Sequence, residues 1–127
     1  MPTGDLSIQA ERHPSGFWIT ITVWVGQHYR VAFVVDSGSP ASVISPEVRS
    51  GLAAAGLLIA GGSPGAYRLT DAWVQGQQMP EFDVRVLPRL DRIHVDGLLG
   101  LDFLTKFETM IFHVPTLTLT LELGTPP

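Results

Sequence analysis

The sequence is organised around an apolar run that stops abruptly at an aspartate. The run from Val31 to Val35 is rich in β-branched residues, which is typical of a strand in the core of a sheet. Asp36 follows it directly, and the turn-forming residues 37–40 then end the strand. This order predicts a carboxylate that is anchored by a buried strand and presented at a bend, where Gly38 leaves room for another chain to approach.

The pattern of the remaining chain predicts an all-β domain with one or two short helices. Residues 17–25 alternate between apolar and polar and are rich in β-branched and aromatic side chains, which makes them the clearest strand. Ser45 and Pro46 have the residue types of a helix cap and a first helical position, so a helix is expected from Pro46 to near Gly56. We further expect a strand at 29–35, a hairpin of 66–74 with 82–87, a charged loop at 88–95, a short strand at 98–99, a helix at 102–107 and a hairpin over 109–121.

Two parts of the chain have the same order of features. Residues 17–56 and 66–107 each contain a hairpin, then a signature of small residues, then a helix. The stretches Trp24-Val25-Gly26-Gln27 and Trp73-Val74-Gln75-Gly76-Gln77 fall at matching places. This weak internal repeat predicts two similar halves.

Length and charge restrict the kind of protein. With 127 residues the chain is one domain, small for an enzyme that must build a deep cleft unaided, which indicates assembly. We expect an N-terminal arm or edge strand at residues 1–16 and the main domain at 17–127. Acids and bases are interspersed at a net charge of −4, without a basic stripe, so nucleic acid is not an expected partner.

Several other kinds of site are not expected. The chain has no cysteine, which excludes disulfides, thiolate catalysis and zinc–thiolate sites, and its four histidines lack ligand spacing, so we expect neither a metal nor a cofactor. No apolar run approaches the roughly 18 residues of a membrane-spanning helix, and residues 1–16 lack the order of a signal peptide. The expectation is a cytoplasmic protein, or a soluble domain of a larger one, without membrane contact.

Three motifs together resemble the retropepsin-like aspartic proteases. They are Val34-Val35-Asp36-Ser37-Gly38-Ser39, then Ala41-Ser42-Val43-Ile44-Ser45, and much later Asp96-Gly97-Leu98-Leu99-Gly100 running into Leu101-Asp102-Phe103-Leu104. The resemblance extends from about Phe17 to Glu122. It implies the closed β-barrel of one acid-protease half.

Peptide hydrolysis by carboxylates requires two of them about 3 Å apart that share one proton. This chain has one Asp-Ser-Gly triplet, so the simplest active form is a homodimer in which Asp36 of each subunit meets at the symmetry axis. The resemblance implies the same arrangement for an endopeptidase that acts on polypeptides, with Ser37 hydrogen-bonding across the axis and Gly38 allowing the loops to approach. We expect activity in acid to mildly acid solution.

The resemblance also implies a flap, the glycine-rich hairpin tip that closes over the substrate. The residues at its expected place are Gly61, Gly62, Ser63 and Gly65, and the alternative is an ordinary surface loop. The same stretch matches G-x-S-x-G, the serine-hydrolase elbow. However, Pro64 follows the serine and has no N–H to give to an oxyanion hole, which argues against that chemistry.

Some alternatives remain open from sequence. Asp96 could form an in-chain pair with Asp36, although Asp96 before Gly97 is more simply a turn residue and Asp102 a helix-capping one. A retropepsin-like domain can also lose catalysis and serve as a dimerisation or peptide-binding module. The alternating final strand is a candidate to pair with a partner subunit.

Overall fold

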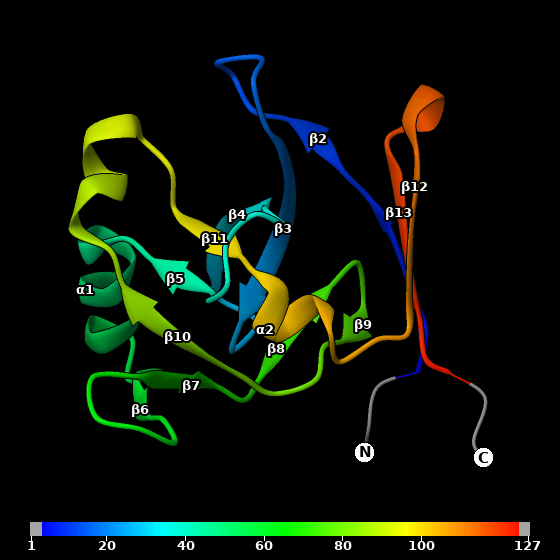
Figure 1. Cartoon of the computed structure of the whole chain (residues 1–127). Helices are drawn as coiled ribbons and strands as arrows, with labels where there is room; N and C mark the ends of the chain where they lie inside the picture. Colours follow the sequence, from blue (N-terminus) through cyan, green and yellow to red (C-terminus); the bar gives the residue numbers. More distant parts are fainter. Residues whose placement is uncertain (1–3, 125–127) are drawn as a thin grey trace.

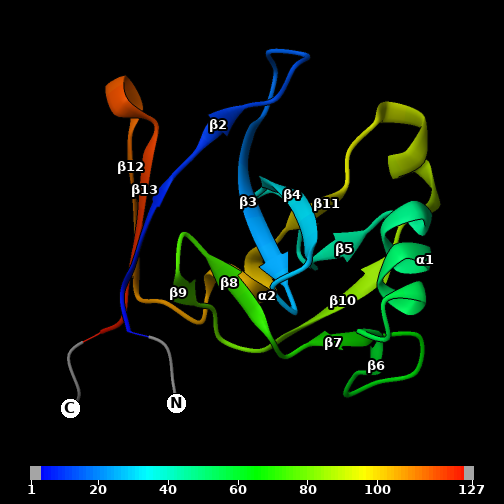
Figure 2. The same cartoon turned by 180° about the vertical axis from the view of Figure 1, so that it is seen from behind.

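The computed structural model describes residues 4–124, which form two β-sheets and a few short helices (Figures 1 and 2). The strands are β1 (Leu6–Gln9), β2 (Glu11–Arg12), β3 (Ile19–Val25), β4 (Tyr29–Val35), β5 (Val43–Ile44), β6 (Ile59–Ala60), β7 (Tyr67–Leu69), β8 (Ala72–Val74), β9 (Gln77–Gln78), β10 (Phe82–Val86), β11 (Gly97–Leu99), β12 (Thr109–His113) and β13 (Thr118–Glu122). The helices are α1 (Pro46–Ala54) and α2 (Leu101–Leu104), with 3₁₀ helices η1 (Pro88–Ile93) and η2 (Val114–Thr116).

The centre of the large sheet has an approximate two-fold arrangement. Its strand order is β6-β7-β10-β5-β11-β4-β3-β8-β9, with β2 paired to β3. The short strands β5 and β11 pair antiparallel at the centre, β4 lies parallel to β11, and β10 lies parallel to β5. The two halves seen in the sequence therefore form matching halves of one sheet. Over the described residues the hydrogen-bonded order is open, with β6 and β9 at its two ends.

A smaller sheet of order β1-β13-β12 stands beside the large one, on the side opposite α1 (Figures 1 and 2). In β1 and β13 alternate residues are buried, whereas no residue of β12 is fully buried. The last strand, β13, is hydrogen-bonded on both sides within its own chain. The expectation that this strand pairs with a partner subunit is therefore wrong. Within residues 4–124, β1 and β12 are the two edge strands of this sheet.

Three local expectations differ from the structure. Residues 66–74 do not form one strand: β7 ends at Leu69, and β8 begins at Ala72 and forms a short hairpin with β9. The expected antiparallel pairing of 66–74 with 82–87 is nevertheless present, since β7 pairs with β10. The charged segment after Leu87 forms η1, since Pro88 fits the first turn of a helix, and α2 ends at Leu104.

The α1 helix begins and ends close to where the sequence predicts. Ser45 is the N-cap residue, and its side chain accepts a hydrogen bond of 3.1 Å from the backbone N–H of Val48. Pro46 occupies the first turn, where a missing N–H costs nothing. The chain leaves the helix through Gly56, which has a φ of 73° that favours glycine.

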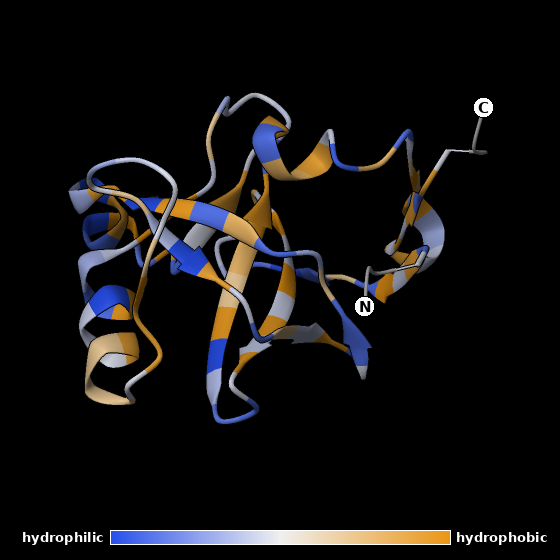
Figure 3. Cartoon of the chain, turned by 90° about the horizontal axis from the view of Figure 1, so that it is seen from below, coloured by the Kyte–Doolittle hydropathy of each residue, from blue (hydrophilic) through white to orange (hydrophobic). Residues whose placement is uncertain are grey.

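One main core lies between the two sheets and α1. It contains Phe33 and Phe103 together with leucines of β1 and β13, so the small sheet packs against the same core as the large one. A second, smaller cluster, Val34, Leu90 and Val95, joins the other side of β4 to η1. Figure 3 shows hydrophobic bands along the strands and hydrophilic residues at many connecting turns. None of the helices within residues 4–124 has the length and apolar character needed to span a membrane.

Candidate active site

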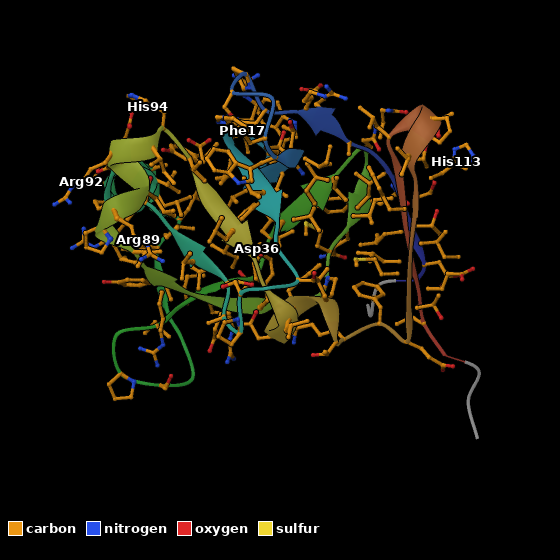
Figure 4. All side chains as sticks on the ribbon, turned by 45° about the horizontal axis from the view of Figure 1, so that its top comes forward. Phe17, Asp36, Arg89, Arg92, His94 and His113 are labelled. Carbon is orange, nitrogen blue, oxygen red and sulfur yellow. The ribbon has the colours of Figure 1, made fainter. Side chains whose placement is uncertain are left out.

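Asp36 lies at the point where β4 leaves the sheet. Its backbone N–H donates to the carbonyl of Leu99 at 2.9 Å, which continues the pairing of β4 with β11 by one residue. The N–H of Gly38 donates to Oδ1 of Asp36 at 3.0 Å, and the N–H of Ser39 donates to its carbonyl at 3.1 Å. The half-buried carboxylate is therefore oriented by its own turn, as the sequence predicts (Figure 4).

The end of β11 supports this turn from behind. The N–H of Leu101 donates to the carbonyl of Ser39 at 2.8 Å. A Cβ on Gly100 would lie 2.6 Å from the carbonyl oxygens of both Ser39 and Ala41, which is too close for any side chain. Gly100 thus lets the second signature pack directly against the backbone of the first.

A buried serine joins the same two segments. The hydroxyl of Ser42 donates to Oδ1 of Asp102 at 2.7 Å and accepts from the N–H of Gly100 at 3.0 Å. The N–H of Ser42 also donates to Oδ2 of Asp102 at 3.0 Å. Ser42 is 1% exposed, so these bonds are largely shielded from water and fix the segment after Asp36 relative to α2.

Asp36 and Ser37 face two different hollows. Asp36 lines a hollow of about 160 Å³ together with Trp18, Val34, Leu87, Arg89, Leu90, Ile93, Val95 and Leu98. Ser37 lines another, of about 180 Å³, with Ile19, Val35 and three residues of the β12–β13 hairpin, Met110, Phe112 and Leu119. The first lies between β4 and η1, and the second lies between the Asp36 turn and the small sheet.

Comparison with known proteins gives the fold. No protein-family model and no curated protein matches the sequence. Among solved structures, the chain is similar to a retropepsin-like aspartic protease from Rickettsia conorii, with a TM-score of 0.60 and 17% identity, over 99% of this chain and 97% of that one. It is also similar to the retroviral protease-like domain of Ddi1 from Leishmania major, with a TM-score of 0.57 and 18% identity, over 87% and 97%. The fold is retropepsin-like.

This result confirms the all-β, retropepsin-like class that the sequence predicts. Within that fold, residues 61–65 form the turn between β6 and β7, on the side of the molecule where α1 lies (Figures 1 and 2). None of these residues lines the hollow next to Asp36. The glycine-rich turn therefore has no part in the hollow that Asp36 lines.

Side chains of β10 hold the glycine-rich turn. The N–H of Gly62 donates to Oδ2 of Asp83 at 2.9 Å, and the guanidinium of Arg85 donates to Oγ of Ser63 at 2.8 Å and to the carbonyl of Pro64 at 3.0 Å. Arg68 forms an ion pair of 2.9 Å with Asp83. The hydrogen bond from Arg68, followed by that from Gly62, lowers the pKa of Asp83 below its ordinary value.

Neither Asp96 nor Asp102 pairs with Asp36. Oδ2 of Asp96 accepts a 2.9 Å bond from the N–H of Ala32, four residues back along β4. At about 3.3 Å per residue, Asp96 and Asp36 lie roughly 13 Å apart along the strand, so the in-chain pair is wrong. Asp102 binds Ser42 and accepts from the N–H of Phe103 at 2.8 Å. It lies in the first turn of α2, but Gly100 is the N-cap residue, so the expected capping role of Asp102 is wrong. Within residues 4–124 no group of three potential metal ligands lies together.

Sequence reasoning missed the residues that surround the carboxylate. The sequence places Trp18 in an expected strand and Arg89 in an expected charged loop, yet both line the hollow with Asp36. The ring of Trp18 meets that of His13 edge-on, with centroids 5.2 Å apart, and Nε2 of His13 lies 3.3 Å from the carbonyl oxygen of His94 after η1. One signal was available in the sequence. In the β3–β4 hairpin even-numbered residues lie opposite even-numbered residues, and alternate residues of a strand share a face, so Trp18, Val34 and Asp36 lie on the same face of the sheet.

Proposed function

We propose that the protein is an aspartic endopeptidase that works as a homodimer and cleaves polypeptides. The observation that carries this proposal is the Asp36 turn, a half-buried carboxylate held by its own loop and packed against the second signature of a retropepsin-like fold. Each chain supplies one such carboxylate. A second copy of the turn, related by a two-fold axis, completes the pair that this chemistry requires.

The pair acts as base and acid in turn. One Asp36 carboxylate takes a proton from water while the other, protonated, gives its proton to the carbonyl oxygen of the cleaved bond. Because the two groups share one proton, the activity is highest in acid or mildly acid solution. Gly38 allows the two turns to approach, and a Cβ there would lie 3.2 Å from Oδ1 of Asp36.

Features near the turn support a dimer. The hydroxyl of Ser37 makes no hydrogen bond with residues 4–124, which leaves it free for the opposite subunit. The exposed strand β12 has a free edge and carries Met110 and Ile111, which are 43% and 49% exposed. The apolar hollow beside Ser37 continues this surface. In this proposal residues 61–65 are the flap, which closes over a bound peptide after its contacts with Asp83 and Arg85 break.

A subunit-mixing experiment tests the proposal. Wild-type protein and the Asp36→Asn variant are mixed at equal amounts, allowed to exchange subunits, and assayed on an unfolded protein at acid pH. If both Asp36 side chains are needed, random pairing leaves about one quarter of the activity of an equal total amount of wild type. A value of one half would mean that each chain works alone. Light scattering reports the dimer, and Asp96→Asn is the control that keeps full activity because an amide oxygen can still accept from Ala32.

A further inference from the structure

The hollow next to Asp36 contains one positive charge that has no partner. The only ion pair among residues 4–124 joins Arg68 and Asp83, so no carboxylate of that part of the chain lies within 4.0 Å of Arg89. The guanidinium also donates no hydrogen bond to residues 4–124. All the other side chains around this hollow, apart from Asp36, are apolar or aromatic. The hollow therefore has an apolar wall, and the guanidinium of Arg89 at its edge is a cation without a partner among residues 4–124.

The size of the hollow suits one side chain. Its volume of about 160 Å³ is close to that of an engineered apolar cavity of roughly 150 Å³ that binds benzene. An aromatic ring or a branched aliphatic group therefore fits against Trp18 and Leu98. Arg89 is exposed on η1, so its guanidinium is available to a group that remains at the surface.

The strand register relates the position of Arg89 to that of Asp36. Val86 of β10 is level with Ile44, which is level with Gly97 and therefore with Phe33 of β4. Leu87, one residue further on, thus lies about four residues back from Asp36 along the sheet, and Arg89 lies just beyond Leu87 on η1. Because β10 is also three strand spacings of about 4.8 Å away from β4, an extended peptide that runs from Asp36 to Arg89 needs several residues, more than the offset along the strands alone would take. Figure 4 shows Arg89 and Arg92 on η1, well to one side of Asp36.

We propose that this hollow selects polypeptide substrates in which an apolar residue next to the cleaved bond is accompanied, several residues away on one side, by an Asp or Glu bound by Arg89. The inference rests on the proposed peptidase function and names the substrates of that same site. Arginine suits the role because its planar, always charged guanidinium matches a carboxylate with two parallel hydrogen bonds. An exposed pair of this kind changes affinity by about fivefold.

The test reverses the charge at position 89 of the protein and, separately, the charge of the substrate residue that Arg89 binds. Peptide mixtures cut by the wild type at pH 6, where acidic side chains are ionised, are identified by mass spectrometry. Matched peptides that differ only in Glu, Gln or Lys at the selected position are then measured for kcat and KM. The variant is Arg89→Glu. The control is Arg92→Glu, which makes the same change at an exposed position of the same 3₁₀ helix that does not line the hollow.

We expect wild type and Arg92→Glu to prefer Glu over Lys by about fivefold, mainly through KM, and Arg89→Glu to reverse the preference. The wild-type preference should shrink in high salt, and below about pH 4 as the substrate carboxylate gains a proton. Cleavage with no acid preference, or with one that Arg89→Glu leaves unchanged, overturns the inference while the peptidase function stands. Absence of any cleavage by wild type overturns the peptidase function and the inference with it.

Discussion

The ends of β4 and β10 occupy matching positions in the two halves of the large sheet but carry different groups. Each strand runs parallel to one of the two central strands, and each is followed by a change of direction. After β4 the chain makes a tight turn with a carboxylate at Asp36, whereas after β10 it places Leu87 at the matching position and enters η1. One half of the fold thus provides the carboxylate of Asp36, and the other half provides the apolar wall beside it. Under the proposed function, this difference is the reason why each chain contributes one carboxylate to the pair.

The largest expected difference between the two strand ends is in turnover. Asp36→Asn should lower kcat by about 10²- to 10⁴-fold, because an amide can neither take nor give the proton. Leu87→Ala should mainly raise KM, since it removes apolar contact from the hollow and leaves the carboxylate in place. Steady-state kinetics on one peptide measures both variants. Equal losses of kcat would contradict the division of roles.

The next effect concerns the glycines that flank the turn. Gly100→Ala should destabilise the protein by about 3 kcal/mol, because the new methyl group meets two backbone oxygens that cannot move independently. Gly38→Ala should cost less stability, since its only close neighbour is the carboxylate of Asp36. Urea unfolding gives both values. Similar stabilities for the two variants would show that the packing at Gly100 relaxes easily.

Loss of the buried Ser42 hydroxyl should destabilise the protein somewhat less than Gly100→Ala does. Ser42→Ala leaves the N–H of Gly100 and Oδ1 of Asp102 without this partner, at a cost of about 2 kcal/mol in unfolding free energy. Ser37→Ala is the matched control, because its hydroxyl makes no hydrogen bond with residues 4–124, and in a dilute monomer its stability should equal that of wild type. If Ser42→Ala is also neutral, Ser42 does not hold the turn to α2.

The smallest effect lies on the β10 side, at the glycine-rich turn. Because the pKa of Asp83 is lowered in the folded protein, its carboxylate stabilises the turn above the ordinary aspartate value of about 3.9, and this contribution is lost as pH falls through the lowered value. The amide signal of Gly62 in NMR spectra should therefore titrate below pH 3.9 and stop titrating in Asp83→Asn. A midpoint at or above the ordinary value would mean that the contact with Gly62 does not persist in solution.

The sequence predicts the strand that carries Asp36 and the helix α1 well, because local patterns decide them. Val31 to Val35 forms a buried strand from composition alone, and Ser45 with Pro46 begins a helix by local capping. The break between Leu69 and Ala72 was not predicted, because it depends on which distant strand each piece meets. Trp18 lies across the β3–β4 hairpin from Asp36, so the parity of the two strands could have indicated it. Arg89 reaches the same hollow only after β4, β11, β5 and β10 have paired, and no local pattern records that contact.

The position of β13 between β1 and β12 has a consequence for how the molecule folds. The N–H of Leu123 donates to Oδ1 of Asp5 at 2.8 Å across 118 residues of sequence, and among the described residues β13 is the only strand that pairs with β1. Closing so long a loop is slow and entropically costly. During synthesis, β1 therefore remains unpaired until nearly the whole domain has left the ribosome. Incorrect pairing between nascent chains should begin at this exposed strand.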